Sequence, residues 1–274
     1  MGDPRTQTLE GRVALVTGAA RGQGRAHAVA LARAGADLAL LDVCRDLPYP
    51  RYRLGTRSEL QETASLVEAE GRRALPLVAD VARLGDMEAA AEALFRELGR
   101  VDVVVCNAGV TDMAKSWDLT EDQWDAMVDI NLKGCWTTTK VTVPQMIDAG
   151  RGGRIVMTSS VAGLRGLGGL AHYAAAKHGV VGFARSLALE LAPHGITVNT
   201  LHPTNVDTPL LDGMADAASL DRADFRASIA DNNVLPVATI DAEDVAAAML
   251  WLVGDGARYV TGQALAVDAG MLLR

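Results

Sequence analysis

Four residues of this chain could together move a proton: Asn131, Ser160, Tyr173 and Lys177. Tyr173 and Lys177 are four positions apart, so a helix would place both side chains on one face. A free tyrosine has a pKa of about 10, too high for ready proton exchange at neutral pH. We expect Lys177 to lower the pKa of Tyr173 towards the range of an acid/base catalyst, because a nearby ammonium favours the phenolate. Alone, the pair also fits an ordinary helix with a tyrosine at the core edge and a solvated lysine.

The elements that must position these residues follow from a regular alternation of short β-branched runs with longer Ala-rich segments. We expect strands at 12–17, 37–42, 73–79, 101–106, 154–159, 197–201 and 263–267, and helices at 22–34, 58–70 (with Ser58 as N-cap), 86–98, 121–148, 172–191 and 241–253. The alternation predicts an α/β fold, a Rossmann-type doubly wound parallel sheet of about seven strands with helices on both faces. We see no linker and expect one domain over 1–274.

A glycine-rich turn follows the first predicted strand and opens the first helix. It reads Thr17-Gly-Ala-Ala-Arg21-Gly22-Gln23-Gly24, with Gly18 directly after the strand. Glycines let a backbone approach a pyrophosphate closely, and a helix N-terminus stabilises that charge. The turn therefore predicts a dinucleotide site, although its spacing differs from G-x-G-x-x-G and a turn without a ligand is the alternative.

The ends of the next three strands also carry polar residues. Asp42, followed by Val43, lies where a carboxylate would accept hydrogen bonds from the adenosine ribose and repel a 2′-phosphate. This favours NAD over NADP, although Arg21 and Arg45 lie nearby. We expect the adenosine to be contacted by the residues after the third and fourth strands, Asp80, Val81, Asn107, Ala108 and Gly109. Each of these also fits ordinary turn chemistry.

Composition narrows the function classes. The net charge of −8 argues against a nucleic-acid surface, which needs a basic stripe. Three scattered cysteines predict neither a disulfide framework nor a metal site. The N-terminus lacks a signal-peptide pattern, and no apolar run is long enough to span a bilayer, so we expect a cytoplasmic protein.

Two segments are longer than the connections they make require. We expect the insertion, residues 44–57, to fold over the adenosine end of NAD and slow the release of NAD. Its residues Pro48, Tyr49, Pro50 and Tyr52 would give it stiffness and a stacking surface. The lid segment, residues 204–239, is expected to cover an apolar substrate, or instead to pack on a neighbouring subunit. Its apolar residues are Leu210, Leu211, Met214, Leu220, Phe225, Ile229 and Leu235.

Taken in order, these motifs resemble the classical short-chain dehydrogenase/reductase family over nearly the whole chain. The resemblance rests on Thr17-Gly18-x3-Gly22-x-Gly24, Asp42, Asp80, Asn107-Ala108-Gly109, Asn131, Ser160, Tyr173-x3-Lys177 and Pro203-x2-Val206-x-Thr208. A narrower match, carried by the insertion and by the runs at 159–163, 172–179 and 202–209, resembles the carveol-dehydrogenase-like branch. That branch is linked to the redox carrier mycofactocin and holds NAD tightly. Cys106 and Thr204 depart from the family pattern, which usually has Asn and Gly there.

The resemblance implies a role for each matched residue. Tyr173 would be the acid/base, Ser160 would hydrogen-bond the substrate oxygen, and Lys177 would also hold the nicotinamide ribose. Asn131 would hold a water that passes protons from Lys177 to solvent. Pro203, Val206 and Thr208 would border the nicotinamide, the last two contacting its carboxamide. A homotetramer is the implied assembly.

The sequence thus predicts an NAD-dependent oxidoreductase that interconverts an apolar secondary alcohol, carveol-like or otherwise alicyclic, and its ketone. One alternative is a 3-ketoacyl-type or other carbonyl reductase with freely exchanging NAD(P)H. A redox-inactive NAD-binding sensor is the non-enzymatic alternative. His172 and His178, which flank the tyrosine and lysine, are expected to be structural or rim residues.

Overall fold

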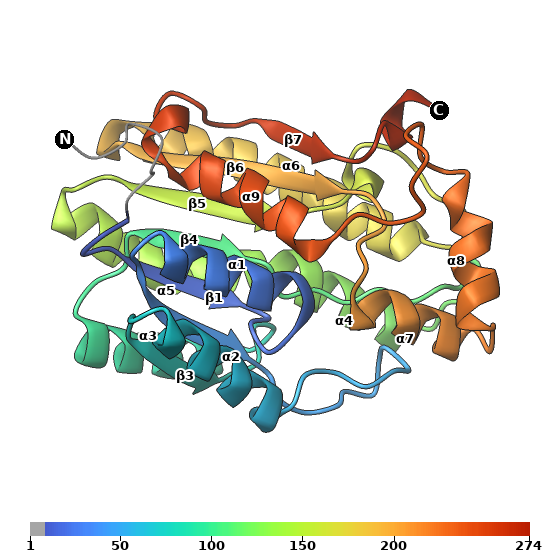
Figure 1. The fold of residues 1–274 in the computed structure, drawn as a ribbon, viewed down its shortest axis with the longest axis horizontal. Coiled ribbons are helices and arrows are strands. Elements are labelled where there is room, and N and C mark those ends of the chain that lie inside the picture. The colour runs from blue at the N-terminus through green and yellow to red at the C-terminus, as the bar shows by residue number, and fades with distance from the viewer. Residues whose placement is uncertain (1–8) are drawn as a thin grey trace.

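In a computed structural model that describes residues 9–274, seven parallel strands form one sheet in the order β3-β2-β1-β4-β5-β6-β7 (Figure 1). The strands are β1 (Val13–Thr17), β2 (Asp37–Asp42), β3 (Ala74–Val78), β4 (Val103–Cys106), β5 (Gly153–Thr158), β6 (Ile196–Pro203) and β7 (Ala264–Val267). The predicted doubly wound sheet is confirmed. The N-terminal segment compared with a signal peptide lies outside the described residues.

Helices cover both faces of the sheet (Figure 1). One core forms where the sheet meets α1 (Gly22–Arg33), α2 (Arg57–Ala69) and α9 (Ala242–Val253). The other forms where it meets α3 (Leu84–Leu98), α5 (Gly134–Ala149) and α6 (Ala171–Leu191). The central strands are therefore buried on both faces, which is why they read as continuous apolar runs.

Two predicted helices differ from the structure. The stretch expected at 121–148 divides into α4 (Glu121–Val128), a π-helical turn (Asp129–Lys133) and α5. The N-cap of α2 is Thr56, not Ser58, because Thr56 forms a reciprocal capping box with Glu59.

Half of the lid segment is helical, in α7 (Pro209–Ala217) and α8 (Arg222–Ala230). Apolar side chains from both helices form a small separate cluster that includes Leu211, Met214 and Phe225. Leu220 and Leu235, predicted to belong to its apolar underside, are instead exposed. The insertion forms neither helix nor strand before α2 and runs from β2 towards α7 (Figure 1).

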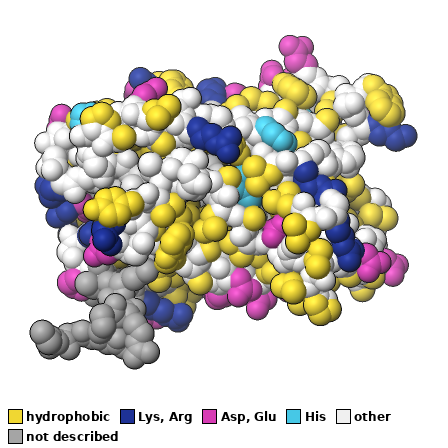
Figure 2. Space-filling model, turned by 90° about the horizontal axis from the view of Figure 1, so that it is seen from above, with side chains coloured by type: hydrophobic (Ala, Val, Ile, Leu, Met, Phe, Trp, Pro, Cys, Tyr) yellow, Lys and Arg dark blue, Asp and Glu magenta, His cyan; other side chains and the backbone are white. Residues whose placement is uncertain are grey.

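One face of the molecule, seen from the side of β7, gathers hydrophobic side chains across its middle (Figure 2). Large apolar residues that are more than three-quarters exposed include Leu189 on α6, Tyr259 before β7 and Leu273 at the C-terminal end. Within residues 9–274, none of the helices has the length and apolar character needed to cross a bilayer.

Candidate active site

The four residues predicted to move a proton converge on one pocket at the carboxyl ends of β4, β5 and β6. Ser160 follows β5, Tyr173 and Lys177 lie in the first turns of α6, and Asn131 lies in the π-helical turn. Because parallel strands end at the same edge of the sheet, residues far apart in sequence meet there. The sequence prediction that these residues form one site is consistent with this geometry.

Tyr173 and Lys177 are held mainly by the end of β5. Ser160 and Tyr173 line the same pocket, and the Ser160 hydroxyl acts to lower the pKa of the Tyr173 phenol. Lys177 Nζ donates to the carbonyl oxygen of Thr158 at 2.8 Å and lies 5.5 Å from the centroid of the Tyr173 ring. Ser159 Oγ donates to the Lys177 carbonyl oxygen at 3.0 Å, which ties α6 to the strand end.

The expected lowering of the tyrosine pKa is not what this structure gives. Burial raises the pKa of Tyr173 to about 12, opposed by the Ser160 hydroxyl. Burial also lowers the pKa of Lys177 to about 8, because the ammonium is costly to desolvate. The prediction failed because sequence spacing shows the neighbour of the tyrosine but not how deeply both groups are buried.

Asn131 is fully buried and ties the π-helical turn to the loop after β4. Its Nδ2 donates to the carbonyl oxygens of Val110 and Met127, each at 2.9 Å. Its Oδ1 accepts from Val110 N at 3.3 Å. A Cβ placed on Gly109 would lie 2.8 Å from Asn131 Oδ1 and 3.3 Å from Lys177 Nζ, so both groups border the same glycine. A π-helical turn inside a helix is frequent at functional sites.

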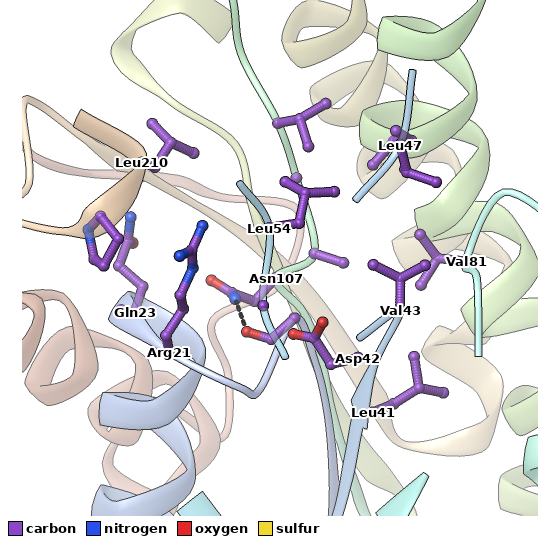
Figure 3. Close-up of a pocket in the computed structure, with 18 of the residues that line it drawn as sticks. Arg21, Gln23, Leu41, Asp42, Val43, Leu47, Leu54, Val81, Asn107 and Leu210 are labelled. Atoms are coloured by element: carbon purple, nitrogen blue, oxygen red, sulfur yellow. Dashed lines mark hydrogen bonds between the residues drawn. The ribbon is translucent and has the colours of Figure 1, made fainter. Parts of the chain in front are cut away.

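A second pocket adjoins the first and lies over the glycine-rich turn (Figure 3). The predicted residues that line it are Gly18, Arg21, Gly22, Gln23, Asp42, Val43, Asp80, Val81, Asn107, Ala108, Gly109 and Thr208. Gly24 lies beneath them, and a Cβ there would come within 1.9 Å of the Gly18 carbonyl oxygen, so only glycine fits. Pro203 and Val206 line the first pocket.

This second pocket fits the diphosphate and adenosine of a dinucleotide. Arg21, the N-cap of α1, makes no side-chain capping bond, which leaves the first backbone N–H groups of the helix for an anion. Gln23 Oε1 is buried without a hydrogen-bond partner among the described residues, and Gln23 borders both pockets. Such an orphaned acceptor is what a ligand with a donor group would satisfy.

Asp42 has the position and charge expected for ribose recognition. Its Oδ2 accepts from Ala20 N and its Oδ1 from Cys44 N, both at 3.1 Å. Burial raises the pKa of Asp42 above its usual value, and these backbone donors oppose the rise. The two nearby arginines are engaged elsewhere: Arg21 with the Arg53 carbonyl oxygen, and Arg45 with Asp80 at 2.9 Å.

Asn107 joins strand ends, whereas Thr208 stands at the start of a helix. Asn107 Nδ2 donates to the Thr17 carbonyl oxygen at 3.1 Å, and its Oδ1 accepts from Thr158 Oγ1 at 3.3 Å, which joins β1, β4 and β5. Thr208 is the N-cap residue of α7. Thr204, at the position where the family usually has Gly, is not among the residues with positive φ, and its Oγ1 donates to Asn233 Oδ1 at 2.8 Å.

The insertion contacts both the second pocket and α6, whereas only contacts with the adenosine were predicted. Leu47, Tyr52 and Leu54 line the second pocket, with Leu47 and Leu54 near Val43 and Asp42 (Figure 3). Tyr49, however, is 6% exposed, and its hydroxyl lies 2.9 Å from His172 Nε2 on α6. It is therefore held by α6 and is not free to stack on an adenosine. His172 is fully buried and is not among the residues that line either pocket.

Other pocket residues were not predicted. Leu167, Leu170 and Met271 line the first pocket, from the segment before α6 and from the C-terminal end. Position after a strand end could have pointed to Leu167 and Leu170, but nothing in the sequence places the C-terminus there. Among residues 9–274, no three His, Cys, Asp or Glu side chains are grouped to hold a metal ion.

Comparisons with known proteins agree with this geometry. The family model described as short chain dehydrogenase matches residues 12–218. The chain is 48% identical to (-)-trans-carveol dehydrogenase from Rhodococcus erythropolis, covering 97% of this chain and 99% of that one. Its fold is similar to that of carveol dehydrogenase from Mycobacterium avium in complex with NAD, with a TM-score of 0.93 and 42% identity over 98% of this chain and 100% of that one. A short chain dehydrogenase from Mycobacterium paratuberculosis bound to NAD gives a TM-score of 0.91 at 38% identity, over 97% and 100% of the two chains. The chain belongs to the short-chain dehydrogenase family.

Proposed function

We propose that this NAD-dependent short-chain alcohol dehydrogenase/reductase interconverts an apolar secondary alcohol, carveol-like or otherwise alicyclic, and its ketone. The observation that carries the proposal is the meeting of Ser160, Tyr173 and Lys177 in a pocket that adjoins the dinucleotide pocket. NAD, when bound, supplies the hydride acceptor or donor. Gly18, Gly22 and Gly24 hold its diphosphate, Asp42 its ribose, and Val206 and Thr208 its carboxamide.

Each polar residue of the pocket has a distinct task in alcohol oxidation. The Ser160 hydroxyl hydrogen-bonds the substrate oxygen and steadies the charge that develops there. Tyr173 takes the alcohol proton, and in reduction it returns that proton to the oxygen. Lys177 holds the nicotinamide ribose, and Asn131 holds the water that links Lys177 to solvent. The raised pKa of Tyr173 means that further positive charge beside the phenol has to bring it into the working range.

The insertion keeps NAD in place between turnovers. Leu47, Tyr52 and Leu54 cover the nucleotide pocket, and Arg45 pairs with Asp80 across its adenosine end. A cofactor retained this way must be reoxidised where it sits, so an external redox carrier has to accept the electrons. The mycofactocin carrier implied by the resemblance is the proposed acceptor.

Apolar contacts favour an apolar substrate. Leu167, Leu170, Leu211, Met214 and Met271 line the pocket that holds Tyr173. The sequence relationship to (-)-trans-carveol dehydrogenase supports the same substrate class.

We also propose a cytoplasmic homotetramer. The exposed apolar side chains Leu189, Tyr259 and Leu273 favour burial against further copies of the chain. The three free cysteines suit a reducing compartment.

The proposal is tested by incubating the purified protein with a panel of alicyclic secondary alcohols and an artificial electron acceptor. We expect reduction of the bound nicotinamide by apolar alcohols, and loss of that reduction in Tyr173→Phe. Turnover that requires added NADPH would instead support a carbonyl reductase with exchanging cofactor. Bound NAD that no alcohol reduces would support a redox-inactive sensor.

A further inference from the structure

The middle of the insertion touches the lid segment at Gly213. Tyr52 lines the nucleotide pocket, and its ring packs directly on α7 at Gly213. A Cβ placed on Gly213 would lie 2.6 Å from Tyr52 Cγ and 2.7 Å from Cδ2, closer than such atoms approach in proteins. The residue that covers the cofactor is thus also the surface against which α7 rests.

Gly213 has no other evident reason to be glycine. It lies inside α7, where alanine would be the better helix former, and it is among the lining residues of neither pocket. Its neighbours Leu211 and Met214 do line the substrate pocket. The close approach of the Tyr52 ring is the contact that requires the missing side chain.

Tyr52 is itself fixed from the catalytic side of the molecule. Its hydroxyl accepts a hydrogen bond from Thr111 N at 3.2 Å, in the loop after β4. Two residues beside it are also anchored there: Arg51 pairs with the buried Asp112 at 3.1 Å, and Tyr49 with His172 at 2.9 Å. His172 directly precedes Tyr173. The insertion therefore spans from Asp42 to the start of the catalytic helix and presents Tyr52 to the lid segment.

We propose that Tyr52 is a positioning residue that joins the insertion and α7 into a single closure over cofactor and substrate. α7 takes its closed position only against an ordered insertion, and the insertion stays ordered only beneath α7. Occupancy of either pocket then favours occupancy of the other, since the coupling between two sites is reciprocal. The inference rests on the proposed retention of NAD by the insertion and adds the element that controls it.

The test is a double-mutant cycle on the release of preloaded NAD. Gly213→Ala adds one methyl group to α7, away from both pockets, and should speed NAD release roughly tenfold because the Tyr52 ring is displaced. It should also raise the KM for carveol while changing kcat little. Gly85→Ala is the matched control, because a Cβ at this helical glycine of α3 meets nothing within 4 Å. In a Tyr52→Ala chain, adding Gly213→Ala should have no further effect, and Tyr52→Phe should restore most of the retention.

Unchanged NAD release in Gly213→Ala, or effects that add to those of Tyr52→Ala, would overturn the inference. If the wild-type protein exchanges NAD freely, the proposed retention of NAD is wrong, but the contact between Tyr52 and α7 can still be tested. Amide hydrogen exchange of α7 then tests whether Tyr52 holds this helix in place. Faster exchange of the α7 amides in Tyr52→Ala, but not in Tyr52→Phe, would support the contact as the link. Identical α7 exchange in the wild type and Tyr52→Ala would exclude it.

Discussion

The strand-end site and the two long segments above it are held in different ways. At the strand ends, Asn107, Asn131 and Lys177 bond to backbone atoms of the sheet and its adjoining loops. The insertion instead rests on side-chain contacts, such as Tyr49 with His172 and Tyr52 with Gly213, and the lid segment has a small apolar cluster of its own. A dense, buried network fixes where the proton moves, whereas a few local contacts can open and close. Substitutions at the strand-end site should therefore change the rate of the reaction, whereas substitutions in the two segments should change the binding and release of cofactor and substrate.

The strand-end site should fail outright when its acid/base is removed. Tyr173→Phe deletes the proton acceptor while keeping a ring that packs against the core. We expect alcohol oxidation to fall on the order of 10³-fold, with NAD binding unchanged, measured by nicotinamide absorbance and by cofactor content. Near-normal turnover in this variant would place the proton transfer elsewhere.

Removing the negative charge at the ribose should change cofactor choice more than rate. Asp42→Asn keeps the shape but loses the charge that disfavours a 2′-phosphate. The preference for NAD over NADP, taken from the ratio of their Kd values, should fall by roughly 10- to 100-fold. An unaltered ratio would mean that the insertion, rather than Asp42, selects the cofactor.

The buried lysine should make stability depend on pH. Its folded-state pKa is lowered to about 8, so between about pH 8 and 10 the unfolded chain binds the proton that the folded one has lost. Lys177 should therefore contribute a rise in the free energy of unfolding with pH in that range, by at most about 1.4 kcal/mol per unit, whereas Cys44 and Cys106, whose thiol pKa values are raised, contribute in the opposite direction in both the wild type and Lys177→Met. Lys177→Met should remove the contribution of the lysine in urea titrations at several pH values. An equal slope in both proteins would contradict the burial argument.

Weakening the contacts of the insertion should have a smaller effect, which is limited to the release of NAD. Tyr49→Phe removes one buried hydrogen bond to His172, which contributes about 1 kcal/mol, and should speed NAD release about fivefold. A single turnover with bound NAD should keep its rate. Tyr259→Phe, the same change at a tyrosine that lines neither pocket, serves as the control. A slower single turnover in Tyr49→Phe would show that the insertion also shapes the chemical site.

The sequence predicts the strand-end site far better than the segments above it. Strands buried on both faces read as apolar runs, and motif spacing then places Ser160, Tyr173 and Lys177 at one edge. The capping box of Thr56 with Glu59 and the Pro209 that starts α7 are further signals in the sequence that mark helix starts. The partners of the insertion were not readable, since Tyr49 and His172 are 123 residues apart. Neither was the pKa of Tyr173, which depends on burial.

The central claim is that the strand-end site carries out the chemistry while the insertion retains NAD. Its most direct test is one turnover with NAD already bound. Protein preloaded with NAD is mixed with carveol in the presence of excess free NAD, and reduced nicotinamide is followed over time. The account predicts one equivalent of reduced nicotinamide per subunit, retained on gel filtration, with further turnover only after an artificial electron acceptor is added. Continuous turnover of the free NAD pool would contradict it.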